Sequence, residues 1–121
     1  MAAPNIVNVS TITAKTKGVD LTTTTTTTLL SNAASSGKVF KINSIIVSNI
    51  DGTNSATCTI AYRNSGGSVF DLGRTIAVPA DSTLVLADKN SVFYLEEGTE
   101  IRGGASAAGD LQAIISYEEI S

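Results

Sequence analysis

The chain has 121 residues, of which 42% are hydrophobic and 5% aromatic, so it has the length and apolar content of one folded domain. It contains no histidine and one cysteine, which excludes imidazole bases, histidine-ligated metals and disulfides within the chain. A net charge of −3 argues against nucleic acid as a partner. The composition therefore favours a structural or binding role over catalysis.

Apolar residues recur with a period of two, and Thr, Val and Ile dominate the apolar runs, as is typical of β-strands. Turn-forming Gly, Asn, Asp and Pro interrupt these runs at short intervals. The pattern predicts eight or nine strands and no substantial helix. In chain order, the predicted strands are residues 6–16, 19–30, 38–49, 56–63, 69–72 with 74–78, 83–87, 92–95, 100–102 and 111–120. We expect an all-β protein, a two-sheet β-sandwich of the jelly-roll kind.

Residues 38–49 are partly apolar on both faces, which predicts a strand that is central in its sheet or lies under a partner. Its two expected faces are Phe40, Ile42 and Ile46, and Val39, Ile45 and Val47. Cys58 alternates with Ile60 and Tyr62, so it is predicted to be a buried, inert thiol.

Two segments are candidates for contacts between subunits. Residues 18–121 are predicted to form the single β-sandwich domain, and residues 1–17 an extended N-terminal arm. The arm either joins its own sheet or lies across a neighbouring subunit, and we favour the neighbour. The run Thr22 to Thr28 gives a strand no internal register mark. It is interpreted as a polar edge strand, with pairing to another subunit as the alternative.

Charge is distributed unevenly along the chain. Residues 1–80 carry six basic and three acidic side chains, whereas residues 81–121 carry two basic and eight acidic ones. The preferred interpretation is that the two halves lie side by side in one domain. The alternative is that separate copies pack a positive patch against a negative one.

We predict no catalytic, cofactor-binding or metal-binding residue. Adjacent residues on a strand point to opposite faces, so neither Glu96-Glu97 nor Glu118-Glu119 is a carboxylate pair in space, and we interpret both as solubilising charges at strand ends. Asp51 to Asn54 resembles a fragment of a calcium loop but lacks the distal glutamate, and is interpreted as a turn. Gly103-Gly104 lacks the lysine of a phosphate-binding loop, and residues 103–110 are predicted to be a loop of small residues.

The second half of the chain carries a family resemblance. Residues 76–86 read IAVPADSTLVL, residues 93–102 read FYLEEGTEIR, and residues 114–120 read IISYEEI. Together with IIVSN at residues 45–49, this order of strands and turns resembles the small virion structural proteins of tailed bacteriophages, of the cyanophage type. The resemblance covers residues 38–120 and transfers no catalytic or ligand-binding residue.

The resemblance implies a non-enzymatic virion protein, most simply a capsid decoration or cement protein. It implies self-association, with a homotrimer favoured, and the major capsid protein as a partner ahead of tail proteins. Residues 1–17 lack the features of a signal peptide and no stretch is apolar enough to cross a membrane, so we expect synthesis in the host cytoplasm and no membrane partner. The alternatives are a tail or baseplate β module and a glycan- or receptor-binding adhesin module, whose candidate loops are residues 50–55, 64–68 and 103–110.

Overall fold

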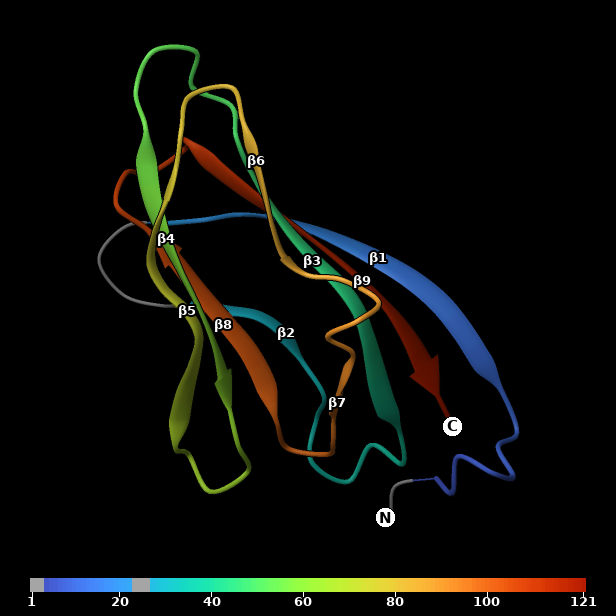
Figure 1. Cartoon of the computed structure of the whole chain (residues 1–121). Helices are drawn as coiled ribbons and strands as arrows, with labels where there is room; N and C mark the ends of the chain where they lie inside the picture. The colour runs from blue at the N-terminus through green and yellow to red at the C-terminus, as the bar shows by residue number, and fades with distance from the viewer. Residues whose placement is uncertain (1–3, 23–26) are drawn as a thin grey trace.

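The structure, a computed structural model, describes residues 4–22 and 27–121, and within them the chain forms nine strands and no helix. The strands lie in two antiparallel sheets that face each other (Figure 1). Their bounds are β1 Ile12–Asp20, β2 Thr27–Ser31, β3 Val39–Asn49, β4 Ala56–Arg63, β5 Val69–Val78, β6 Thr83–Ala87, β7 Phe93–Leu95, β8 Glu100–Ala105 and β9 Leu111–Ile120.

The order of the strands is that of a jelly roll. The five-stranded sheet runs β1-β9-β3-β6, with β7 also paired to β3, and the four-stranded sheet runs β2-β8-β4-β5. The chain changes sheet at every connection except the β4–β5 hairpin and the β6–β7 link. Two four-stranded layers connected in this way define the jelly roll, to which β7 is an addition. The predicted two-sheet, all-β fold is confirmed.

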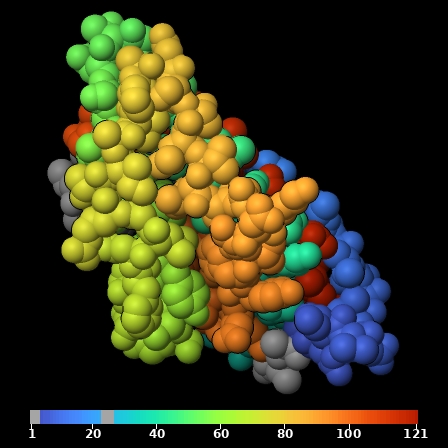
Figure 2. All heavy atoms as spheres, in the orientation of Figure 1, coloured from blue at the N-terminus to red at the C-terminus, as the bar shows by residue number. Residues whose placement is uncertain are grey.

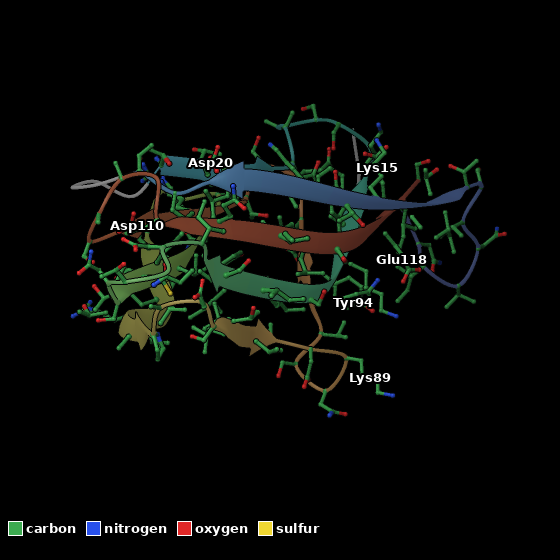
Figure 3. All side chains as sticks on the ribbon, turned by 90° about the horizontal axis from the view of Figure 1, so that it is seen from above. Lys15, Asp20, Lys89, Tyr94, Asp110 and Glu118 are labelled. Atoms are coloured by element: carbon green, nitrogen blue, oxygen red, sulfur yellow. The ribbon has the colours of Figure 1, made fainter. Side chains whose placement is uncertain are left out.

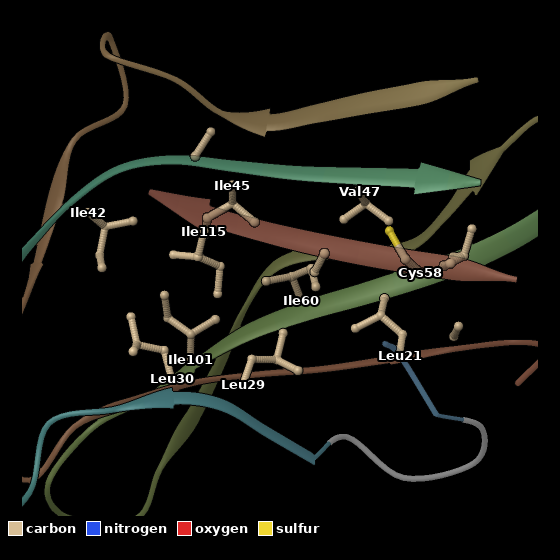
Figure 4. Packing of buried hydrophobic residues seen from close by; sticks show 14 of the residues in the cluster. Leu21, Leu29, Leu30, Ile42, Ile45, Val47, Cys58, Ile60, Ile101 and Ile115 are labelled. Carbon is tan, nitrogen blue, oxygen red and sulfur yellow. The ribbon is translucent and has the colours of Figure 1, made fainter. Parts of the chain in front are cut away.

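The core is a layer of branched aliphatic side chains between the sheets (Figure 4). In β9 the alternating residues Leu111, Ala113, Ile115 and Tyr117 all face this layer. Cys58 of β4 is buried in the same layer, as predicted. Fully buried residues meet from both sides: Ile45, Val47 and Ile115 from the five-stranded sheet, and Leu29, Ile60 and Ile101 from the four-stranded sheet.

Gly103 lets the four-stranded sheet close over this core. A Cβ atom at position 103 would lie 2.7 Å from Cδ1 of Ile60 and 2.8 Å from Cδ1 of Leu29. The prediction of a loop from residue 103 onward is therefore wrong, because residues 103–105 belong to β8, which pairs with both β2 and β4. Glycine serves here to admit neighbouring side chains.

A β-bulge changes the faces of β3. The register of β3 against β9 shifts between Ile42 and Ser44. A residue inserted at this point reverses the alternation, so Ile45 and Val47 join Ile42 in the core. Ile46 points outward, and its predicted place on the face of Ile42 is wrong. The central position of β3, between β9 on one edge and β6 and β7 on the other, is confirmed.

The segment predicted to lie on a neighbour joins its own sheet. Residues 12–17 are part of β1, which pairs with β9 from Ile12 opposite Ile120 to Asp20 opposite Gln112. Just before β1, the backbone N–H groups of Ser10 and Thr11 donate to the carbonyl of Ser121 at 2.7 and 2.9 Å. The preference for a neighbouring subunit is wrong for this segment, since β1 satisfies the backbone groups on the edge of β9 within one chain.

Further strand boundaries differ from expectation. The predicted strand 6–16 begins only at Ile12, because residues 6–8 form a turn and residues 9–11 are not part of a strand. Gly18 does not interrupt β1, because its backbone pairs with Ile114 like any strand residue. The predicted strand 19–30 is divided between the end of β1 and β2, which lie in different sheets. Residues 69–78 form one strand, with an irregular register near Thr75, whose φ is 51°.

The threonine run is described at three of its seven positions. Thr27 and Thr28 lie in β2, at an edge of the four-stranded sheet, and the carbonyl of Thr22 accepts a hydrogen bond from the N–H of Ala105 at 2.9 Å. Thr23 to Thr26 lie outside the described residues.

The close packing at Gly103 can be tested by substitution. We expect Gly103→Ala to lower the free energy of unfolding by about 1–3 kcal/mol, because the new methyl group displaces Ile60 and Leu29 in a filled core. The control is Gly52→Ala, where a Cβ would be in ordinary contact, 3.5 Å from the nearest atom, Oδ2 of Asp81, and stability should change by no more than about 0.5 kcal/mol. Urea unfolding of both variants measures the difference. Equal stability of the two variants would contradict this account of Gly103.

Candidate functional site

The three candidate loops do not converge. At one end of the sandwich, the N–H of Ile50 donates to the carbonyl of Asp110 at 2.8 Å, and the N–H of Asp81 donates to the carbonyl of Asp51 at 3.1 Å. Loop 50–55 and residues 106–110 are therefore neighbours, together with the Pro79 turn. Loop 64–68 lies at the opposite end (Figure 1), where Cβ of Ser65 is 3.5 Å from the position of a Cβ on Gly98. No single site is built from all three.

Asp51 stabilises its own turn. Its carboxylate accepts hydrogen bonds from the backbone N–H groups of Thr53 and Asn54 at 2.8 and 3.2 Å. These bonds, first that from Thr53, hold the pKa of Asp51 below its ordinary value. The interpretation of this segment as a turn is confirmed. In the part of the chain that the structure describes, no three acidic, cysteine or histidine side chains are grouped closely enough to hold a metal ion.

The side chains of Glu118 and Glu119 point to opposite faces of β9, as their adjacency predicted. Glu118 accepts a hydrogen bond from Nδ2 of Asn43 at 2.9 Å and lies 4.0 Å from Nζ of Lys41. Glu119 binds Nζ of Lys38 at 2.8 Å and Nζ of Lys15 at 3.1 Å. The hydrogen bond from Lys38 is the main reason why the pKa of Glu119 is below its ordinary value of 4.5.

These ion pairs explain the uneven charge of the sequence. The lysines come from β1, from β3 and from the residue before β3, whereas both glutamates come from β9. In the other sheet, Arg63 of β4 lies 3.5 Å from Glu100 of β8. Basic residues of the first part of the chain thus pair with acidic residues of the last part inside one domain, in agreement with the preferred interpretation.

The remaining predicted positions are structural. Glu97 accepts a hydrogen bond from the backbone N–H of Gly37 at 3.0 Å, and Glu96 is exposed at the same turn. Burial raises the pKa of the Cys58 thiol, which disfavours the reactive thiolate.

An aromatic groove is one hollow of the surface that the sequence did not predict. It has a volume of about 290 Å³, and its apolar lining comes from Tyr62, Phe70, Leu72, Phe93 and Tyr94, with Asp71 at its rim. Phe70 is 57% exposed and Tyr94 41% exposed. Figure 2 faces this side of the molecule, where the yellow-green segment around residue 70 meets the orange segment around residue 93. Four of the six aromatic side chains of the chain are gathered here.

Part of this groove could be predicted from the sequence. The Asn64 to Gly67 hairpin places Tyr62 directly opposite Phe70, so one aromatic pair follows from the turn alone. Phe93 and Tyr94 belong to β7 in the other sheet, and their approach depends on how the two sheets are stacked. Alternation along single strands contains no information about that stacking.

The sequence matches no protein-family model, and no curated protein matches it. Within residues 4–22 and 27–121 there is no helix long and apolar enough to span a membrane.

The ion pairs of Glu119 predict a pH-dependent contribution to stability. Because its pKa is lower in the folded protein than its ordinary value, the contribution is present above pH 4.5 and is lost as the pH falls through the folded-state pKa. We expect Glu119→Gln to lower the free energy of unfolding by about 0.5–1 kcal/mol at pH 7 and by almost nothing near pH 2.5. Urea unfolding at both pH values measures this. Glu96→Gln is the control and should change stability at neither pH; a deficit of Glu119→Gln that persists in acid would contradict the assignment.

Proposed function

We propose that this chain is a non-enzymatic structural protein of a bacteriophage virion, a decoration protein that associates with itself and attaches to the capsid shell. The observation that carries the proposal is the jelly-roll order of its strands, because this architecture serves viral capsid proteins as well as lectins. The resemblance of residues 38–120 to small virion proteins points in the same direction. A tail- or baseplate-associated position is the nearest variant of this role.

A decoration protein binds a shell that repeats the same attachment site many times. A decoration protein gains apparent affinity when linked copies attach to many equivalent sites, so each contact can be modest. Exposed apolar side chains on β5 of the four-stranded sheet can supply such contacts, since Val69, Phe70 and Leu72 are each more than 40% exposed.

The proposal is tested on virions from a phage in which the gene for this chain is deleted. The purified protein should co-sediment with these particles at a fixed ratio and restore their resistance to heat and osmotic shock. Particles that already carry the protein are the control and should bind almost none. Absence of binding to heads and tails, with unchanged resistance of the deleted particles, would refute the proposal.

The aromatic groove favours a second candidate function, the binding of a glycan. Aromatic faces exposed beside a carboxylate, as Phe70 and Tyr94 are beside Asp71, are typical of sugar-stacking sites.

This second candidate is tested by presenting the protein in multivalent form to an array of glycans. Phe70→Ala should weaken binding by at least about tenfold, because it removes the most exposed ring of the groove. Val69→Ala, on the same strand but outside the groove lining, is the matched control. No binding above background would remove the candidate.

A further inference from the structure

The outward side of the five-stranded sheet carries an ordered arrangement that the fold does not need. Outward-pointing residues of this sheet are called the outer face here. In β9 the outward residues are those between the core positions, and the pairing registers place each of them in a row that crosses the sheet. At the centre, Ile114 lies between Gly18 of β1 and Ile46 of β3, and Ile46 in turn lies beside Val85 of β6.

The rows beside this apolar row are polar and small. On one side, Ser116 lies between Thr16 and Ser44. On the other, the row is Asp20, Gln112, Ser48 and Thr83. Charged side chains occur only toward the two ends of the face, as Figure 3 shows for Asp20 at one end and Glu118 near the other.

This composition is that of an interface centre. Single exposed apolar residues are ordinary on protein surfaces. Here three apolar residues stand side by side in register, and Val85 is 56% and Ile114 39% exposed. Neither this row nor the row of Ser116 contains a charged residue. Loss of charge at the centre with polar groups around it is the pattern of protein–protein contacts.

The apolar row has a hollow at one end, at Gly18, and a projecting side chain at the other, that of Val85. At Gly18 the position of a Cβ has no atom within 4 Å, and a hollow of about 300 Å³ opens there beside Asp20 and Ile114. At the other end, on the edge strand β6, the side chain of Val85 projects into solvent.

We infer that the outer face packs on the outer face of a second copy, across a two-fold axis parallel to the strands. This axis reverses the strand order, so that β1 faces β6 of the second copy and β9 faces β3 of the second copy. Each Val85 then enters the hollow at Gly18 of the other copy, and each Ile114 packs on Ile46 of the other copy. The face is self-complementary, as a two-fold interface requires.

The charges agree with this arrangement. Glu118 on β9 and Lys41 on β3 occupy the same row, so the axis places each Glu118 opposite Lys41 of the second copy. Likewise Asp20 faces the uncharged Thr83 of the second copy. Gln112, whose Nε2 donates to Asp20 at 2.9 Å within its own chain, faces Ser48, from whose hydroxyl its amide oxygen can accept a hydrogen bond. Within these rows no like charges face each other.

The size of the face suits a modest interface. The sheet is four strands wide along its length, because β6 and β7 follow one another on the same edge of β3. At one end of the face the outward residues Val39 and Ile120 are already buried, and Pro4 and Ile6 of the same chain lie beside Val39. With a strand spacing of about 4.8 Å and an open length of about 24 Å, the face covers roughly 450 Å² per copy. Two copies would bury about 900 Å², the size of a weak, reversible complex.

This inference rests on the self-association in the proposed function and deepens it by naming the surface. It differs from the trimer that the resemblance implies, since a two-fold axis closes with two copies. The native mass of the protein, measured by sedimentation from about 1 to about 100 µM, should rise with concentration toward twice the 12.4 kDa of one chain. A trimeric mass, or a monomeric mass at every concentration, would overturn the inference.

Two substitutions test the surface itself. Gly18→Lys fills the hollow, and Val85→Glu buries a carboxylate beside Asp20 of the second copy. Each acts twice in a symmetric pair, so each should raise the dissociation constant by at least about 100-fold. The matched control is Val69→Glu, at a valine of β5 that is 47% exposed, and it should leave the mass unchanged. Circular dichroism of all three variants verifies the fold.

A mixture of the two variants gives the sharpest result. A mixed pair contains one native contact of Val85 with Gly18 and one new contact of lysine with glutamate. Chains with Gly18→Lys and chains with Val85→Glu, each monomeric alone, should therefore form a one-to-one dimer when mixed. If both variants remain dimeric alone, or if the mixture stays monomeric, the proposed pairing is wrong.

Particle binding separates this inference from the proposed function. Chains that remain monomers in solution but bind deleted virions would overturn the pairing and leave the virion role standing. If Val85→Glu also abolished that binding, the occupant of the outer face would be the shell and not a second copy. A dimer that binds no particle would support the pairing and refute the virion role.

Discussion

The double pairing of β9 is the interaction on which the rest of the structure depends. This strand is hydrogen-bonded to β1 along one edge and to β3 along the other, so it fixes the registers of these two strands, and β3 in turn pairs with β6 and β7. One set of its residues, including Ile115, fills the core, and the alternate set, including Ile114, forms the middle of the outer face. A slip by one residue would exchange the two sets, and the cost of exposing the core therefore also holds the surface rows in place.

Much of the fold follows from local patterns. The strands 56–63, 83–87 and 111–120 were predicted with their observed bounds, because alternation of apolar residues ends at recognisable turns in each case. The same reasoning gave the burial of Cys58 and the opposite orientations of Glu118 and Glu119. These features depend on neighbours along the chain, and the sequence contains that information directly.

The failures share a different cause, which is dependence on a distant partner. The bulge near Asn43 exists only relative to β9, and the strand conformation of Gly103 depends on the side chains of Leu29 and Ile60. The first residues of β1 were assigned to a neighbour because a polar segment does not show which sheet edge is free. For the surfaces, the sequence showed which residues are aromatic and which are charged. The position of the aromatic groove depends on how the two sheets stack, and the rows of the outer face depend on the pairing registers of the strands.

The pairing of β1 with β9 also has a consequence for how the protein is made. Residue 12 lies opposite residue 120, and among the described residues β1 is hydrogen-bonded to β9 alone. On a ribosome, the backbone of β1 therefore stays unpaired until residues 111–120 have been made. Such distant pairing lengthens the search for the native topology and makes folding slow for a domain of this size. A mostly polar, lysine-bearing first strand suits this interval, because it is poorly suited to pairing with other nascent chains.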